Sequence, residues 1–238
     1  MPDFQGKVAL VTGVGAAGQI GHAVAQGLGR AGARLVLADR NAAGVVERSK
    51  EFAAQGLDAR AAAGDLTRPQ DAATAVRMAV REFGGLDVVV NVAGGLINYG
   101  SISGVTPDQL DLELAVNLKT AFFVCQAAVP ALVDRGGGAI VNFASVAVLQ
   151  PMSQMAAYSA AKAAVAGFTR ALAAEVAGQK IRVNAVAPAT VRTAANVAQD
   201  PQGRFVELDH LVHAVLFLAS DEARAITGQV LPVTGMEP

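Results

Sequence analysis

Short apolar runs alternate with amphipathic stretches along most of the chain. The runs are rich in valine, leucine and alanine and predict strands at residues 7–12, 34–39, 58–63, 87–91, 139–143 and 181–186. Between them, apolar residues recur three or four positions apart, as on the buried face of a helix; Ile20, Val24 and Leu28 form one such stripe. Strands that alternate with helices predict a parallel sheet with helices on both faces.

Two of the predicted helices are long, at about 107–135 and 155–177. Pro130 lies inside the first, where it should bend the helix or end its regular part. A helix at 208–219 and a strand at 229–233 follow, and Pro232 places that strand at a sheet edge because proline cannot donate to a ladder. The pattern therefore predicts one domain over residues 1–238, a doubly wound (Rossmann) α/β fold with a parallel sheet of about seven strands.

Composition excludes several classes of partner. The chain has 238 residues, 53% of them hydrophobic, and a net charge of −1, which gives no electrostatic case for nucleic acid or an anionic membrane. Charged residues precede the first apolar stretch, and polar residues interrupt the longest uncharged one, so we expect neither a secretory signal nor a membrane span. Cys125 is the only cysteine and fits core packing in a reducing cytoplasm. The histidines lack metal-ligand spacing, so no metal site is predicted.

A glycine-rich turn, Thr-Gly-Val-Gly-Ala-Ala-Gly-Gln-Ile-Gly at residues 12–21, joins the first strand to the first helix. Such a turn lets the backbone approach a pyrophosphate at a helix N-terminus, although a tight turn without a ligand explains it almost as well. Asp39 ends the second strand, where an acidic residue binds ribose hydroxyls and repels a 2′-phosphate. Arg40 argues against this preference for NAD, since it could contact a phosphate, although it could also contact the adenine. The sequence favours NAD over NADP as cofactor.

Tyr158 and Lys162 lie one helical turn apart in the alanine-rich helix. A neighbouring ammonium stabilises a phenolate, so we expect Lys162 to lower the Tyr158 pKa and make proton transfer possible near neutral pH. Ser145 follows the strand at 139–143, which places its hydroxyl at a strand's carboxyl end. By itself the Tyr-x-x-x-Lys pair is weak evidence, because such a pair also occurs on helix surfaces.

These motifs together resemble the short-chain dehydrogenase/reductase family in its single-domain form. Besides the glycine turn and the Tyr158–Lys162 pair, the motifs in chain order are Gly64-Asp65-Leu66, Asn91-Val-Ala-Gly94, Asn117, Ser145 and Pro188 through Thr193. The resemblance extends from Lys7 to about Gly235. No single motif decides it, but their order does.

The resemblance implies a role for each matching residue. Tyr158 would be the general acid/base, Lys162 would hold the nicotinamide ribose, Ser145 would bond the reacting oxygen, and Asn117 would steady a water that links Lys162 to solvent. The implied contacts of the cofactor are Gly13, Gly18, Gln19, Ile20, Gly21, Asp39, Arg40, Asp65, Leu66, Asn91, Ala93, Gly94, Tyr158, Lys162, Pro188, Val191 and Thr193. Structural alternatives remain for two of them: Asn117 could cap backbone at a helix irregularity, and Pro188 could simply end a strand.

Some features depart from the family pattern. The glycine turn is two residues longer than usual and resembles the enoyl reductase branch, but that branch has its tyrosine seven positions before the lysine, where this chain has Met155. The segment 194–207, where relatives have a substrate lid, is short, so the site should be open. The positions expected to face the substrate are small or apolar and favour a neutral compound: Gly95, Leu96, Val146, Ala147, Met152 and Ala189.

Three functions fit the motifs. The first is an NAD-dependent oxidoreductase that interconverts a neutral secondary alcohol and its ketone. The second is a reductase of 3-oxoacyl groups on a carrier protein or coenzyme A, which calls for basic residues beside the site; Arg135 could serve, but Ala174 occupies the place of a second one. The third is a non-catalytic NAD-binding protein, which the intact Asn117, Ser145, Tyr158 and Lys162 disfavour.

The alanine-rich helix also predicts an assembly. Its outer face has small uncharged residues where a solvated helix would show lysine and glutamate. Small side chains permit close helix packing across a twofold axis, and the exposed last strand offers a second axis. Two such axes generate a homotetramer; a helix-paired dimer and a monomer are the alternatives.

Overall fold

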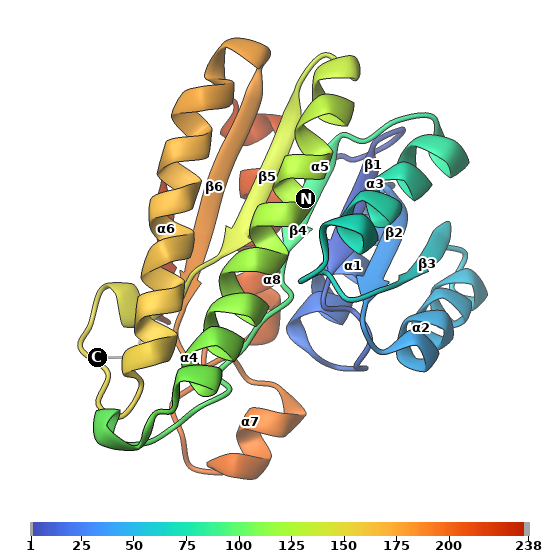
Figure 1. Cartoon of the computed structure of the whole chain (residues 1–238). Coiled ribbons are helices and arrows are strands. Elements are labelled where there is room, and N and C mark those ends of the chain that lie inside the picture. Colours follow the sequence, from blue (N-terminus) through green and yellow to red (C-terminus); the bar gives the residue numbers. More distant parts are fainter. Residues whose placement is uncertain (1, 236–238) are drawn as a thin grey trace.

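The computed structural model describes residues 2–235, in which one parallel sheet of seven strands forms the centre (Figure 1). The strands are β1 Val8–Thr12, β2 Arg34–Asp39, β3 Ala59–Ala63, β4 Val88–Asn91, β5 Gly138–Phe143, β6 Ile181–Pro188 and β7 Val230–Val233. Their spatial order is β3-β2-β1-β4-β5-β6-β7, and every neighbouring pair is parallel. The predicted doubly wound fold is confirmed, and β7 lies at the edge as Pro232 required.

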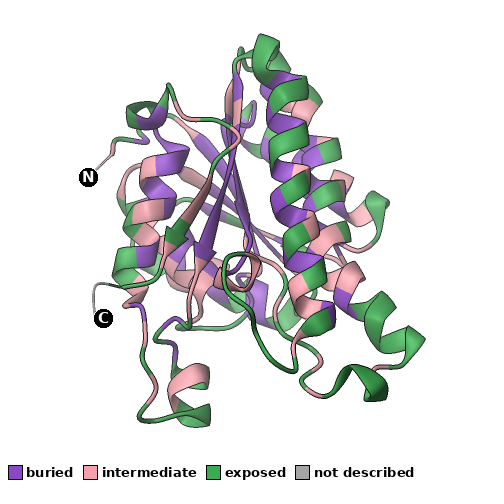
Figure 2. Cartoon of the chain, turned by 90° about the vertical axis from the view of Figure 1, so that its left-hand side faces the viewer, coloured by how far each residue is buried: buried purple, intermediate pink, exposed green. Residues whose placement is uncertain are grey.

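Helices cover both faces of this sheet. On one face lie α1 (Ile20–Arg30), α2 (Ala42–Ala54) and α8 (Leu208–Ala219), and on the other α3 (Pro69–Phe83), α5 (Thr120–Asp134) and α6 (Ala156–Val176). Successive residues of a strand point to opposite faces, so Ala9 and Val11 pack in the first core while Val8 and Leu10 pack in the second. Both faces are buried, as Figure 2 shows for the central strands, which explains the continuous apolar runs.

The order of the strands determines where a ligand can bind. β1 lies between β2 and β4, so the chain winds outward in opposite directions from the β1–β4 pair. In such sheets the crevice at the carboxyl ends of the strands, beside this reversal, is the usual ligand site. The glycine turn leaves β1 at this edge, and α4 (Pro107–Leu114), α7 (Ala194–Gln199) and the start of α6 lie at the same end of the molecule (Figure 1).

The long predicted helix has an irregularity in its middle. It consists of α4 (Pro107–Leu114), a π-helical segment Ala115–Lys119, and α5, which continues past Pro130 to Asp134. The alternative in which Pro130 ends the regular part is therefore wrong. By length and composition alone the segment Pro107–Asp134 could cross a membrane, but it packs on α3 and β4, as a core helix does.

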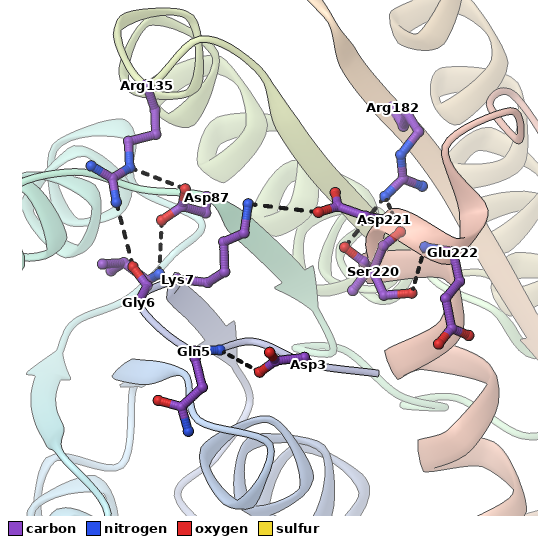
Figure 3. Close-up of polar contacts among 12 residues, drawn as sticks. Asp3, Gln5, Gly6, Lys7, Asp87, Arg135, Arg182, Ser220, Asp221 and Glu222 are labelled. Atoms are coloured by element: carbon purple, nitrogen blue, oxygen red, sulfur yellow. Dashed lines mark hydrogen bonds and ion pairs between the residues drawn. The ribbon is translucent and has the colours of Figure 1, made fainter. Parts of the chain in front are cut away.

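The opposite, amino-terminal end of the sheet contains a polar hollow of about 500 Å³. Its charged groups contact one another (Figure 3): Arg135 Nε donates to Asp87 Oδ1 at 3.0 Å, and Lys7 Nζ lies 4.0 Å from Asp221 Oδ2. Arg182 donates to the last carbonyls of α8 and the residue that follows it. Arg135 thus lies at the end of the sheet away from the predicted site, so the suggestion that it serves beside that site is wrong.

Candidate active site

Ser145, Tyr158 and Lys162 meet at the carboxyl edge of β5. Ser145 follows this strand and is 7% exposed; its Oγ accepts the Ala147 amide at 3.2 Å and so begins a 3-10 turn at Val146–Val148. Tyr158 and Lys162 lie in the first two turns of α6, and the phenol of Tyr158 is hydrogen-bonded with Ser145. The sequence therefore brings a hydroxyl, a phenol and an ammonium to one place.

Lys162 is 4% exposed, and its Nζ donates to the carbonyl of Phe143 at 2.8 Å. The same ammonium lies 5.8 Å from the centre of the Tyr158 ring. Burial lowers the pKa of Lys162 to about 8, against the opposing effect of the Glu113 carboxylate. The lysine is consequently a buried cation that is poised to lose its proton at mildly alkaline pH.

The pKa of Tyr158 moves in the direction opposite to the one expected. Burial of the phenol raises it most, and the Glu113 carboxylate raises it further, while the hydrogen bond with Ser145 lowers it. The Lys162 ammonium, which donates to the Phe143 carbonyl, is not among the groups that move the pKa of Tyr158. The prediction that Lys162 lowers the Tyr158 pKa is therefore wrong for the polypeptide: helical spacing indicates proximity, but burial dominates the charge balance.

Asn117 lies in the π-helical segment, and both the oxygen and the nitrogen of its side-chain amide form hydrogen bonds with nearby residues of the same chain. Its Oδ1 accepts the Gly95 amide at 2.9 Å, and its Nδ2 donates to the carbonyls of Gly95 and Glu113 at 2.9 and 3.0 Å. Gly94 has a φ of 137°, and a Cβ there would lie 2.7 Å from Asn117 Oδ1, which explains this glycine. The side chain of Asn117 thus fixes the loop after β4 and the helix irregularity, as the capping alternative proposed.

Glu113, one turn before Asn117, is a site residue that the sequence analysis missed. Its side chain is 0% exposed, and its carboxylate accepts hydrogen bonds from the loop after β4 and from Asn117. The signal was present in the sequence: an acidic residue four positions before Asn117, on the same face of the predicted helix.

The glycines of the long turn have separate structural causes. Gly13 has a φ of 75°, and a Cβ there would lie 2.9 Å from the Ala93 nitrogen; Gly21 packs directly on the Gly13 carbonyl. The amide of Gly15 donates to Asp39 Oδ2 at 2.7 Å, so the two additional residues fold the turn onto the end of β2. These contacts leave Gly18, where a Cβ would meet nothing within 4 Å, as the open glycine of the turn.

Comparisons with known proteins agree with this geometry. A family model described as Enoyl-(Acyl carrier protein) reductase matches residues 15–235. A D-threitol dehydrogenase of Mycolicibacterium smegmatis is 36% identical, over 98% of this chain and 94% of its own. A cyclohexanol dehydrogenase of Acinetobacter sp. is 35% identical, over 98% and 95%. A crystal structure described as a short-chain alcohol dehydrogenase of Sinorhizobium meliloti 1021 has a TM-score of 0.89 at 36% identity, covering 98% of this chain and 96% of that one. This chain is a short-chain dehydrogenase/reductase.

Members of the short-chain dehydrogenase/reductase family are oxidoreductases that use NAD or NADP, and the residues present fit such a cofactor. α1 begins beside the glycine turn, and its N-cap residue Gln19 makes no side-chain cap, so the first amides of an 11-residue helix are left for an anionic group. Asp39 lies where a ribose would follow; Oδ1 accepts the Asn41 amide at 2.8 Å, and each carboxylate oxygen keeps a further lone pair. Arg40 is exposed beside it.

Asp65 and Leu66, at the end of β3, differ in how they could meet an adenine. Asp65 Oδ1 accepts from both the amide and the hydroxyl of Thr67, which lowers the Asp65 pKa, and Oδ2 lies 3.8 Å from Arg68 Nε in an exposed ion pair. Leu66 is 5% exposed and packs in the core under α3. The position of Leu66 beside an adenine ring therefore stays a prediction, and its backbone is the part that could make this contact.

Three further side chains in the short-chain dehydrogenase/reductase motifs are turned into the protein. Asn91 is 3% exposed and its Nδ2 donates to Asn142 Oδ1 at 2.9 Å and to the Cys125 sulfur at 3.2 Å, so its side chain links β4 to β5 and α5, and its contact with a ribose stays a prediction. Thr193 Oγ1 caps α7, and Val191 is buried in a bridge to Val206. Ala93 donates its amide to Thr12 Oγ1 at 3.0 Å, and Pro188 is the last residue of β6.

Cys125 matches its interpretation as a core residue. It is 1% exposed, and burial raises its thiol pKa to about 12. Because the thiolate is the reactive form, this cysteine is chemically inert at neutral pH.

Proposed function

We propose that this short-chain dehydrogenase/reductase is a single catalytic domain that oxidises a neutral secondary alcohol, or reduces the matching ketone, with NAD(H). The observation that supports this most is the meeting of Ser145, Tyr158 and Lys162 at the same carboxyl edge of the sheet as the glycine turn. In oxidation, Tyr158 accepts the hydroxyl proton of the substrate while Ser145 donates a hydrogen bond to the same oxygen. Lys162 holds the ribose side of the site and supplies positive charge. Bound NAD supplies the hydride acceptor.

The walls of the site favour a substrate without charge. Leu96 and Ile97 follow β4, and Leu149 and Met152 follow Ser145; these four side chains are between 38% and 53% exposed. Apolar side chains on both sides of the opening suit a ring or a hydrocarbon chain better than a charged group. The names of two relatives, a cyclohexanol and a D-threitol dehydrogenase, span an apolar and a hydroxylated alcohol. We infer that the apolar alcohol is the better model.

Neither of the two positions considered for a basic residue beside the site provides one, which argues against a carrier-linked substrate. Arg135 lies at the amino-terminal end of the sheet, paired with Asp87, and Ala174 is an exposed alanine on α6. The enoyl reductase activity in the description of the family model does not transfer either, because Met155 stands at the position of its tyrosine. Both activities are therefore less well supported than alcohol oxidation.

A substrate panel tests the proposal. The purified protein is given cyclohexanol, a linear secondary alcohol, a four-carbon polyol and a 3-oxoacyl thioester, each with the NAD and the NADP form of the cofactor, and reduced nicotinamide is followed by absorbance. We expect oxidation of the apolar secondary alcohols with NAD. Activity confined to the thioester, or to NADP, would contradict the assignment.

Asp39 should determine the choice of cofactor. Replacing it with alanine removes the carboxylate expected to bind the ribose hydroxyls and to repel a 2′-phosphate, so the preference for NAD over NADP should fall by about tenfold or more. The ratio of kcat/KM with the two cofactors measures this. Asp58→Ala, which removes an exposed acid that precedes β3, is the matched control. A wild-type enzyme that already prefers NADP would show that this interpretation of Asp39 is wrong.

We also propose a cytoplasmic homotetramer. The outward face of α6 presents a stripe of exposed small residues, Ala156, Ala160, Ala163, Gly167, Ala171 and Ala174, and β7 leaves an uncovered sheet edge. Light scattering at micromolar concentration should give about four times the 24.1 kDa chain mass. A mass of two chains would support only the helix-paired interface, and the mass of one chain would refute both interfaces.

A further inference from the structure

Glu113 is a fully buried acidic side chain, 0% exposed, surrounded by hydrogen-bond donors. The amides of Ile97 and Asn98 point at it, with distances of 3.3 Å to each oxygen from Ile97 and 3.0 Å to Oε2 from Asn98. The Asn98 side chain donates at 3.2 Å, and Asn117 Nδ2 donates to Oε1 at 3.1 Å. Every one of these partners is an N–H group. The donor set suits an ionised carboxylate, which only accepts.

The partners of Glu113 belong to both halves of the site. Ile97 and Asn98 lie in the loop after β4 that forms the proposed substrate wall, whereas Asn117 is in the helix irregularity that faces α6. One side chain therefore ties the wall of the substrate site to the helical segment that packs against α6. A buried carboxylate that accepts several N–H bonds fixes its neighbours more firmly than a neutral acceptor does.

Glu113 is also a charge near the two titrating groups of the site, because α4, which carries Glu113, packs against α6, which carries Tyr158 and Lys162. Its carboxylate raises the pKa of Tyr158 and opposes the lowering of the Lys162 pKa by burial. The other charged residues on the elements packed around α6 are exposed, or lie toward the far end of the sheet: Asp108, Asp111, Lys119, Asp134, Arg135, Arg170, Glu175 and Arg182. A charge in the interior is screened far less than these.

We propose that Glu113 is a positioning residue with two effects: it clamps the substrate-side loop to Asn117, and it provides the fixed negative charge that faces the Tyr158–Lys162 pair. The proposal deepens the alcohol dehydrogenase function and rests on it only for its kinetic half. The negative charge favours the protonated phenol and the protonated ammonium. Its removal should therefore make both groups lose their protons at lower pH.

The charge effect can be measured without substrate or cofactor. The chain has two tyrosines and no tryptophan, so in a Tyr99→Phe background Tyr158 is the only aromatic chromophore that titrates. The near-ultraviolet absorbance of tyrosinate then reports the ionisation of Tyr158, and circular dichroism verifies the fold at each pH. We expect Glu113→Gln to shift the midpoint to lower pH. Asp111→Asn, which removes an exposed charge from the same helix, should leave it in place. An unshifted or higher midpoint in Glu113→Gln refutes the charge role.

A second neutral variant protects this test against misfolding. The amide that Glu113→Gln introduces would present an NH₂ group to some of the N–H donors, whereas Glu113→Ala leaves room for water to pair with them. Either neutral variant that folds decides the question. The titration of Tyr158 does not depend on enzyme activity. A negative result in the titration can therefore be distinguished from a negative result in the substrate panel.

The Glu113→Asp variant tests whether Glu113 holds the loop after β4. Aspartate keeps the negative charge, but its shorter side chain moves the carboxylate away from the amides of this loop. We expect KM for the alcohol to rise several-fold with kcat little changed, and the Tyr158 midpoint to stay close to that of the parent protein. In Glu113→Gln the pH profile of alcohol oxidation should also move to lower pH. A purely structural role would instead lower activity in both variants and leave the profile in place, which would overturn the proposal.

Discussion

Tyr158→Phe should lower turnover by about 10²–10⁴-fold, the usual contribution of a positioned general acid or base. The substitution keeps the aromatic ring, which is mostly buried, and removes only the hydroxyl that is hydrogen-bonded with Ser145. The cofactor should still bind with a similar Kd, because the ring continues to fill its place. Steady-state kinetics of alcohol oxidation and a fluorescence titration with NADH measure the two quantities separately.

Tyr99→Phe is the matched control, since it removes the other tyrosine hydroxyl, from a side chain that is 64% exposed. Its turnover should be close to that of the wild type. The raised pKa of Tyr158 also predicts how the two reactions depend on pH. The rate of alcohol oxidation, which needs the phenolate, should increase toward alkaline pH, and the rate of ketone reduction, which needs the phenol, should decrease. If Tyr158→Phe retained more than roughly a tenth of wild-type turnover, a different group would have to move the proton.

The strands were predictable along the sequence because both faces of the sheet are buried. The predicted strand at 34–39 has the bounds of β2, and its run of Leu-Val-Leu-Ala needs no polar alternation. β3 had the weakest sequence signal, and it is the strand with exposed residues at Arg60 and Ala63. It lies at the sheet edge, where selection for apolar residues is weaker.

The site was predictable as a set of positions but not as a set of side-chain directions. The motifs brought Ser145, Tyr158 and Lys162 together, yet a motif cannot show that Asn91 turns inward to Asn142 and Cys125. The helix irregularity at Asn117 could be given only as an alternative because its cause is tertiary: Asn117 bonds to Gly95, which is 22 residues away in the sequence. The pKa of Tyr158 depends on burial, and spacing along a helix does not report burial.

Lys162→Met should abolish useful turnover and at the same time stabilise the protein. Lys162 is buried, and its pKa falls from an ordinary 10.5 to about 8 in the folded chain. A shift of this size corresponds to roughly 3 kcal/mol of unfavourable free energy for the charged form at neutral pH, since one pKa unit is worth about 1.4 kcal/mol. Methionine has a similar length and no charge. The lost hydrogen bond to Phe143 should offset about 1 kcal/mol of this gain, which leaves a net stabilisation of roughly 2 kcal/mol.

The pH dependence has a definite sign. Between about pH 8 and 10.5 the unfolded chain holds the Lys162 proton and the folded chain does not, so this residue makes the wild type more stable as pH rises through that window. Lys162→Met has no such group, and its advantage should therefore be largest at pH 7 and vanish near pH 10.5. Urea denaturation at a series of pH values measures the difference, with the exposed Lys50→Met as control. A Lys162→Met protein less stable than the wild type at neutral pH would mean that the buried ammonium holds the fold together through its contacts, and that its place in the site has no stability cost.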